Sequence, residues 1–318
     1  MTKNAPQSLR HIIETCELSH AEFSDHYNVL KRRIDDAISG SHPPALLRLI
    51  GPSRVGKSML ITNLARHYPD LRVNGIRQIP VLVVEVPSPV SPKEMPKSVL
   101  QALGVPTARG NSVDLFAKMK TLLEKAGTKV VLFEEASHIV EVGTKMPPRA
   151  AGDWFKQLLD RVGVTVIMFG VPHLEKLFAS NEQLRKRAQA PREFRPYDPT
   201  DDEQRKAFGQ CVITFAKMFA DAGRPFDMSM DILVPQCFLF SGGLVGVVSK
   251  FMSQLAYDLE EEPAKPITKM DCVKALKAIE ASGHPEHPAF ERDQVTLVEM
   301  EQAHIYTLEE AKLSRRRR

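Results

Sequence analysis

The sequence predicts an α/β fold in which a parallel sheet is covered by helices on both faces and is followed by a small all-helical domain. Two observations support this prediction. Between residues 46 and 169, four short and continuously apolar segments alternate with amphipathic segments, as in buried parallel strands joined by helices. After residue 197 apolar residues recur only at helical spacing, and no strand pattern remains. A chain of 318 residues is long enough for both parts.

Composition limits the kinds of partner. Lys and Arg number 43 against 39 Asp and Glu, and the four arginines at 315–318 account for the whole excess. The rest of the chain is neutral, which excludes nucleic-acid binding through bulk charge and leaves only a local patch. The four cysteines form no CxxC pair, so neither a zinc knuckle nor a disulfide framework is predicted. Since the sequence shows no signal peptide and no apolar run of spanning length, we expect a cytoplasmic protein with no membrane role.

The elements of the first part follow from hydrophobic spacing. Ser19 and Glu22 form a capping box that begins a helix over residues 20–39. Continuous apolar runs predict the strands, which lie at 46–50, 81–86, 130–133 and 164–169. Amphipathic spacing predicts the helices between them, at 57–68, 113–126 and 153–162.

Three amphipathic helices make up the second part. The first begins at a capping box of Thr200 and Glu203, the second starts near Leu244, and the third covers 268–281. The polar segment after them is partly helical near 297–313 and ends in arginines. The predicted division is an N-terminal segment and helix at 1–40, a sheet domain at 41–197, a helical domain at 198–282 and a basic C-terminal tail at 283–318.

The segment GPSRVGKS at 51–58 matches G-x-x-x-x-G-K-[ST] in full. Its glycines allow a tight loop whose backbone N–H groups point at phosphate oxygens, and the helix that follows adds the positive end of its dipole. Lys57 brings a positive charge to the β and γ phosphates, and the Ser58 hydroxyl is placed to ligate Mg²⁺. Because an apolar strand precedes the motif and an amphipathic helix follows it, we predict an ATP site formed by Gly51, Pro52, Ser53, Arg54, Val55, Gly56, Lys57, Ser58 and Met59.

An apolar strand that ends in paired acids, VVLFEE at 130–135, is the second half of such a site. In this arrangement Glu134 supports the Mg²⁺ shell together with Ser58, and Glu135 polarises the attacking water as the catalytic base. The first acid is usually Asp, so Glu134 is longer by one methylene. A solvated charge pair at a strand end is the alternative. His138, one helical turn further on, is interpreted as structural.

Two further segments offer candidate residues. In oligomeric ATPases an arginine near the basic segment 181–187 reaches the γ-phosphate of the adjacent subunit, and we take Arg187 as the first choice and Arg185 as the second. A solvated helix end is the alternative. Gly243, in the run SGGLVG at 241–246, is predicted to let a helix start approach the nucleotide, and an ordinary cap or hinge is equally open. Lys250 is a weaker candidate for contact with the phosphates.

The ordered set of motifs resembles an AAA+ ATPase, in which a P-loop, an acidic strand, a strand ending in Gly-x-Pro, a basic segment and a three-helix lid follow one another. Finer segments are similar to the TniB/TnsC family of transposition ATPases over residues 8–282; they are VVEVPSPVSP at 83–92, VLQALG at 99–104, EEASH at 134–138, WFKQL at 154–158 and FGVPHL at 169–174. This sequence departs from the family at Glu134, usually Asp, and at Val171, more usually Thr. Both departures bear on the rate of hydrolysis more than on nucleotide binding, and His173 is a candidate to replace the missing polar group.

The resemblance implies a function that composition does not show. Such proteins bind ATP with Mg²⁺, form homo-oligomeric rings or helical filaments on double-stranded DNA, and recruit a DDE transposase, with a target-selection protein as a further possible partner. Their DNA contacts are mainly to the backbone and are therefore sequence-tolerant and salt-sensitive. In this chain Lys93, Lys97 and Arg109 are the candidate DNA-facing residues, with a solvated loop as the alternative.

Other classes stay open at this point. A nucleotide-switched signalling or scaffold ATPase would not bind DNA, but it usually carries a winged-helix domain and repeats after the lid. A replication-loader-type AAA+ ATPase would share the fold and usually has a separate DNA-binding domain. A small-molecule kinase fits least, because it has no helical domain of this size. The arginines at 315–318 are consistent with a DNA-binding arm, a docking peptide or a solubilising end.

Overall fold

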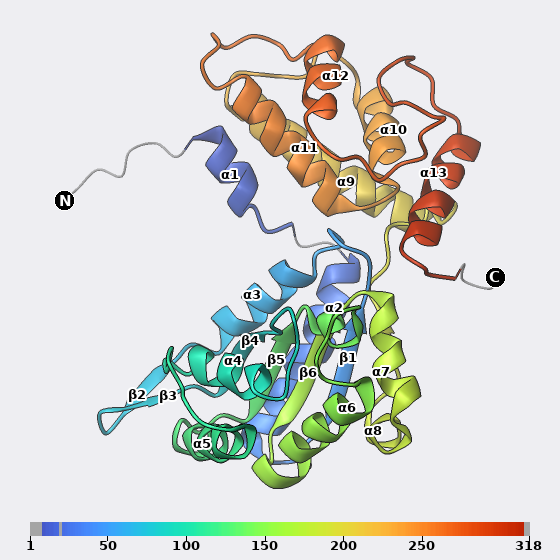
Figure 1. Ribbon diagram of the computed structural model, residues 1–318. Helices are drawn as coiled ribbons and strands as arrows, with labels where there is room; N and C mark the ends of the chain where they lie inside the picture. The colour runs from blue at the N-terminus through green and yellow to red at the C-terminus, as the bar shows by residue number, and fades with distance from the viewer. Residues whose placement is uncertain (1–7, 19–20, 315–318) are drawn as a thin grey trace. The chain divides into compact units, whose positions relative to one another are not determined.

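The computed structural model describes residues 8–18 and 21–314 (Figure 1). The terminal arginines and the Ser19 half of the predicted capping box lie outside the described residues. The chain divides into two compact units. The sheet unit contains Glu22–Ser53 and Lys57–Phe194, and the helical unit contains the chain before residue 22, Arg54–Gly56, and the chain from Arg195 onward.

Five parallel strands form the sheet, in the order β4-β5-β6-β1-β7. They are β1 (Leu46–Ile50), β4 (Val81–Glu85), β5 (Val130–Glu134), β6 (Thr165–Gly170) and β7 (Arg192–Glu193). The strands β1 and β6 are buried along their whole length, which is why they read as continuous apolar runs. The carboxyl ends of parallel strands share one edge, so the segments after β1, β5 and β6 meet there, with β6 in the middle. The predicted parallel α/β fold is confirmed.

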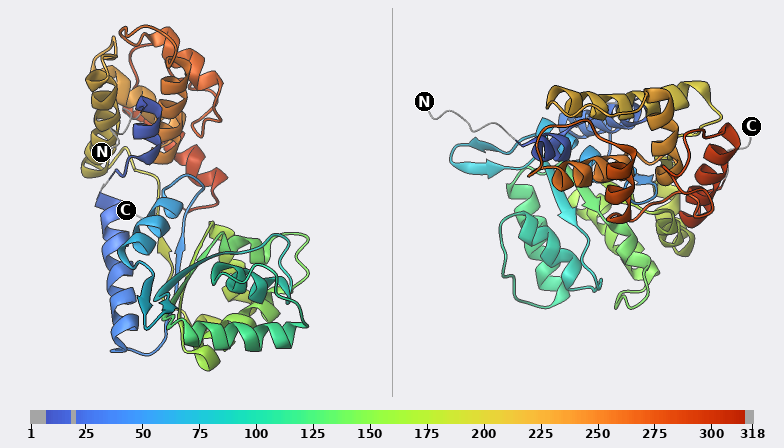
Figure 2. Two further views of the ribbon diagram at one scale, coloured as in Figure 1. Left: turned by 90° about the vertical axis from the view of Figure 1, so that its left-hand side faces the viewer. Right: turned by 90° about the horizontal axis from the view of Figure 1, so that it is seen from above.

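Helices cover both faces of the sheet. α2 (Ala21–Ser39) and α3 (Lys57–His67) lie on one face, and α5 (Ser112–Lys125) and α6 (Pro148–Gln157) lie on the other (Figure 2). This division follows from right-handed crossovers, because α3 leads to the far edge strand β4 and the later helices return across the sheet. The remaining elements of the unit are α4 (Glu94–Ala102), α7 (Glu175–Ser180), α8 (Glu182–Arg187) and the short turns η1 (Ala136–Val140), η2 (Leu158–Val162) and η3 (Pro172–Leu174).

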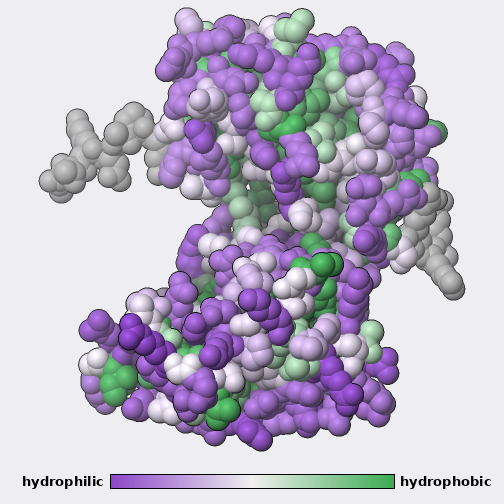
Figure 3. All heavy atoms as spheres, viewed as in Figure 1, coloured by the Kyte–Doolittle hydropathy of each residue, from purple (hydrophilic) through white to green (hydrophobic). Residues whose placement is uncertain are grey.

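The structure differs locally from the sequence expectation. A hairpin of β2 (Leu71–Val73) and β3 (Ile76–Gln78), absent from the prediction, is closed by Asn74 and Gly75, both at positive φ. Its strands of three residues are too short for an alternating pattern to stand out. The side chains of Leu71, Val73 and Ile76 are more than half exposed and give apolar surface at one corner of this unit (Figure 3).

A buried charge lies within strand β1. The Arg48 guanidinium donates to the Glu175 carboxylate at 2.6 Å and stacks over the Phe178 ring, 4.0 Å from its centroid. Because an unpaired charge in such a strand would be strongly unfavourable, this contact anchors α7 against the sheet. It places the segment that follows β6 beside the P-loop strand.

The helical unit contains six helices among the described residues, namely α1 (Leu9–Thr15), α9 (Asp202–Asp221), α10 (Met230–Ser241), α11 (Val245–Asp258), α12 (Lys269–Lys277) and α13 (Leu297–Glu310). α1 packs on α11 and α9. Its Ile13 is fully buried, and its Glu14 carboxylate accepts from Ser253 at 2.9 Å. The predicted segment 1–40 is therefore divided, since α1 belongs to the helical unit while nearly all of α2 belongs to the sheet unit.

The segment after residue 282 is also part of the helical unit. The buried Gln236 amide donates to Arg292 O at 2.5 Å and accepts from Phe290 N at 2.6 Å. α13 packs on α10 and buries Ala303, and a Cβ on Gly242 would overlap Thr307. The helix expected near 297–313 is present, but 283–314 is packed against the unit rather than extending from it as a tail.

Within the described residues, no single helix is both long enough and apolar enough to cross a membrane. The helices α10 and α11 reach that length and hydropathy only when they are counted as one segment, and they are bent by 112° where they meet.

Candidate nucleotide site

The P-loop leaves strand β1 and enters helix α3 as the motif requires. The Gly51 N–H donates to Gly170 O at 3.1 Å, which ties the start of the loop to the end of β6. Arg54 and Gly56 have φ of 65° and 116°, in a region that only glycine adopts without strain. α3 begins at Lys57, so its first N–H groups face the loop and favour a bound anion. The loop therefore has the backbone conformation and the position before a helix that phosphate binding requires, and phosphate binding by these residues stays a prediction.

The Lys57 side chain folds back onto this loop. Its ammonium donates to Gly51 O at 2.9 Å and to Pro52 O at 2.7 Å. Burial lowers the pKa of the Lys57 ammonium to about 8, while the carboxylates of Glu135 and Glu134 act in the opposite direction. A phosphate beside Nζ would favour the charged form, so nucleotide binding and protonation of Lys57 are coupled.

This coupling gives a pH dependence. Above about pH 8 the free protein loses the Lys57 proton and the ATP-bound protein retains it, so ATP affinity should fall by up to about tenfold per pH unit. Calorimetric titration in buffers of different ionisation enthalpy would measure the accompanying proton uptake. Lys57→Arg is the control, because a guanidinium does not titrate in this range and the slope should disappear. An equal slope in both proteins would contradict the assignment to Lys57.

Ser58 and Glu134 lie together at the carboxyl edge of the sheet. The Ser58 hydroxyl donates to Glu134 Oε1 at 2.5 Å. A hydroxyl and a carboxylate oxygen side by side match the hard oxygen ligands of Mg²⁺, which takes its remaining ligands from phosphates and water. Residues 8–18 and 21–314 hold no cluster of three or more His, Cys, Asp or Glu that could bind a metal alone. The residues present therefore fit a nucleotide-bound Mg²⁺, and Glu134 reaches Ser58 despite its extra methylene.

Glu135 follows in a left-handed conformation, with φ 52° and ψ 36°. A non-glycine residue there costs on the order of 1 kcal/mol and persists only when its surroundings hold it. The turn directs the chain from β5 into η1. The two acids, adjacent in sequence, are thus held in different backbone conformations, in keeping with different roles.

The end of β6 has no polar side chain at the position expected for one. At Val171 the backbone N–H instead donates to Ser137 Oγ at 2.7 Å, a contact that the sequence did not suggest. His173 lies in η3, and its Nε2 is buried without a hydrogen-bond partner within the described part of the chain. The role predicted for His173, to replace the polar side chain that is missing at Val171, stays a prediction.

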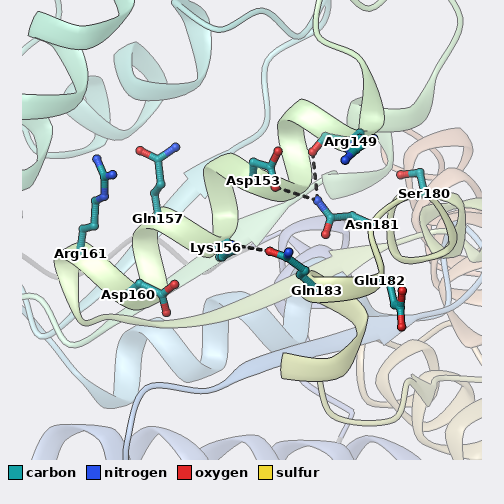
Figure 4. Close-up of a pocket in the computed structure, with 10 residues that line it drawn as sticks. All are labelled: Arg149, Asp153, Lys156, Gln157, Asp160, Arg161, Ser180, Asn181, Glu182 and Gln183. Carbon is teal, nitrogen blue, oxygen red and sulfur yellow. Dashed lines mark hydrogen bonds between the residues drawn. The ribbon is translucent and has the colours of Figure 1, made fainter.

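The two arginine-finger candidates lie on α8. The Arg187 guanidinium pairs with the Asp160 carboxylate of η2, whereas Arg185 is exposed and joins no ion pair among the described residues. Between α6–η2 and the α7–α8 corner is a pocket of about 710 Å³ (Figure 4). Asn181 lines it and donates to Arg149 O and to Asp153, both at 3.1 Å. No P-loop residue lines this pocket, so it is separate from the nucleotide site.

Gly243 is explained by its local packing. A Cβ on Gly243 would lie 2.4 Å from Tyr197 O, and the Tyr197 N–H donates to Gly243 O at 3.0 Å. The close approach of these two backbones requires glycine there, and contact with nucleotide stays a prediction. Lys250 is exposed on α11.

The DNA-facing candidates lie around α4. Lys93 is exposed immediately before the helix, and Arg109 is exposed in the loop between α4 and α5. The Lys97 ammonium pairs with Glu94 at 2.8 Å, so part of its charge is neutralised within the helix. Lys93 and Arg109 therefore offer the more available charge.

Comparisons with known proteins agree with this architecture. The model of the family described as bacterial TniB protein matches residues 27–195, just over half of the chain. No curated protein sequence matches.

Among solved structures, Cdc6p from Pyrobaculum aerophilum is 13% identical with a TM-score of 0.61, over 96% of this chain and 86% of its own. The ORC2 protein of Aeropyrum pernix in its ADP form is 11% identical with a TM-score of 0.59, over 86% and 73%. The ORC1 protein of Aeropyrum pernix, solved in complex with DNA, is 11% identical with a TM-score of 0.57, over 85% and 69%. At these identities the structural likeness shows a shared fold.

Proposed function

From the premise that this chain belongs to the TniB family and is an AAA+ ATPase, we propose that it is an ATP-dependent regulator of transposition. In this proposal it oligomerises on double-stranded DNA with little sequence preference and recruits a DDE transposase to the target. The proposal that the protein binds and hydrolyses ATP rests on one observation: Lys57, Ser58 and Glu134 lie together at the carboxyl edge of the sheet.

Each residue of the site has a part in hydrolysis. Lys57 and the loop N–H groups bind the phosphates, and Ser58 with Glu134 would hold Mg²⁺, which neutralises phosphate charge when bound. Glu135 accepts a proton from the attacking water. Arg185 or Arg187 reaches the γ-phosphate of a neighbouring subunit; for Arg187 this requires release from Asp160.

The DNA part is supported by exposed positive charge and by the shared fold. Lys93 and Arg109 are exposed near α4, on a chain whose body is otherwise neutral. The ORC1 protein of similar fold was solved in complex with DNA. Because ATP-dependent assembly would place copies of this surface along the duplex, weak backbone contacts would add up to stable binding.

The test is duplex-DNA binding with ATP, with ADP and without nucleotide, read by fluorescence anisotropy and electron microscopy. We expect binding and rings or filaments only with ATP. Reversing the charge at Lys93 and Arg109 should weaken binding and lower the salt slope by about 2 per subunit in contact. The double variant Lys118→Glu and Lys125→Glu, at two exposed lysines of α5, is the matched control and should leave binding unchanged.

Two outcomes contradict parts of the proposal. Unchanged DNA binding in the charge-reversal variant would exclude the α4 surface as the contact. Tight ATP binding with no DNA binding under any nucleotide would favour the signalling or scaffold class instead.

A further inference from the structure

We propose that Ser137 and His138 are positioning residues that hold Glu135 in place for ATP hydrolysis. They do so by tying the turn after β5 to the ends of the strands on both sides, β6 and β4. This inference rests on the proposed function, in which Glu135 accepts the proton of the attacking water. It assigns a role to two residues of η1 that only the tertiary structure brings into contact with neighbouring strands.

Ser137 makes the contact to β6. Its side chain is 1% exposed, and its hydroxyl oxygen accepts from the Val171 N–H at 2.7 Å. The end of β6 is shaped around this hydroxyl, because a Cβ on Gly170 would lie 2.5 Å from Ser137 Oγ. A buried and fully enclosed hydroxyl of this kind holds two segments in one relative position.

His138 makes the contact to β4. Its Nδ1 lies 3.0 Å from Val86 O, the residue that follows the strand. A carbonyl oxygen only accepts hydrogen bonds, so Nδ1 carries the proton and donates. The Val86 N–H in turn donates to Glu134 O at 3.0 Å, so the backbones of β4 and β5 are joined immediately before Glu135.

The contacts explain how a strained residue keeps its conformation. Glu135 is left-handed, and without support its backbone would relax toward a common region of φ and ψ. The same end of β6 also holds the start of the P-loop. The Gly51 N–H donates to Gly170 O, and Gly170 directly precedes Val171, whose N–H donates to Ser137. Hydrogen bonds thus connect the Glu135 turn through the end of β6 to the loop that binds ATP.

The first variants are Ser137→Ala and His138→Gln. Since a displacement of about 1 Å can lower a rate about 100-fold, we expect kcat to fall by roughly 10- to 100-fold in each. The Kd for ATP should stay within about twofold, because Lys57 and the loop N–H groups are unchanged. His138→Asn should retain kcat, because an asparagine amide nitrogen occupies nearly the position of histidine Nδ1. Ser39→Ala, at the exposed end of α2, is the matched serine control.

A double-mutant cycle tests the Ser137 contact itself. Gly170→Ala would displace the Ser137 hydroxyl and should therefore reproduce the loss of kcat in Ser137→Ala. The double variant should be no slower than Gly170→Ala alone, because both substitutions break the same contact. If the loss of kcat in the double variant equals the product of the two single losses, the two substitutions act independently, and the proposed role of the contact between Ser137 and β6 is overturned.

The outcomes separate this inference from the function on which it rests. If Glu135→Gln abolishes hydrolysis while Ser137→Ala and His138→Gln leave kcat unchanged, Glu135 keeps its role and the positioning role is overturned. If the variants lose ATP affinity and thermal stability as well as kcat, Ser137 and His138 stabilise the fold rather than position Glu135, and the positioning role is again overturned. If Glu135→Gln hydrolyses ATP normally, the assignment of Glu135 as the base fails.

Discussion

Glu135→Gln is expected to lower kcat for ATP hydrolysis by about two to four orders of magnitude, the range for loss of a general base. The Kd for ATP should change little, because the side chain proposed to contact the phosphates of ATP is Lys57 rather than Glu135. Glutamine keeps the size of Glu135 but cannot accept the proton of the attacking water at neutral pH. Phosphate release under single-turnover conditions would measure the loss, together with ATP binding by calorimetry.

Glu85→Gln is the matched control for this variant. Glu85 ends β4 and lies directly beside Glu134 in the sheet register, but its side chain is exposed and has no proposed role. Its kcat should equal that of the unmodified protein. If DNA binding depends on the ATP-bound state, Glu135→Gln should also prolong the DNA complex. Normal turnover in Glu135→Gln would show that another group activates the water.

Lys57→Ala is expected to weaken ATP binding by about 10- to 150-fold, the range for losing a hydrogen bond from a charged group. The variant should fold normally, because burial of the Lys57 charge is itself unfavourable, as its lowered pKa shows. ATP-dependent DNA binding should disappear at ATP concentrations that saturate the unmodified protein. Calorimetry and anisotropy on the same samples would measure both losses.

The control for Lys57→Ala is Lys125→Ala, at the exposed end of α5. It removes the same charge from the sheet unit and should bind ATP and DNA as the unmodified protein does. Lys57→Ala that loses ATP affinity but still binds DNA would separate DNA binding from the nucleotide site. Restored DNA binding at much higher ATP would confirm that occupancy is what Lys57 supplies.

Several parts of the fold and site were predictable because they depend on local patterns. The runs at 46–50 and 130–133 are apolar throughout since both faces of the sheet are covered, so strands were predicted there. The P-loop was predictable because glycines, lysine and serine must stand at fixed spacing to bind phosphate. The hairpin at 71–78 was missed, since its short strands bury too little to leave a pattern. α1 is too short to reveal which unit it packs on.

The sequence by itself determined the identity of the parallel sheet, the phosphate loop and the paired acids, because their chemistry depends on residues a few positions apart. Tertiary structure alone decided the contacts that join distant segments. It paired Ser58 with Glu134, folded Lys57 onto its own loop, and joined Ser137 to Val171. It also packed the segment after residue 282 against α10, through a buried glutamine and glycines that accept close neighbours. Such contacts leave no periodicity in a single sequence, since they depend on strand order and on burial rather than on spacing.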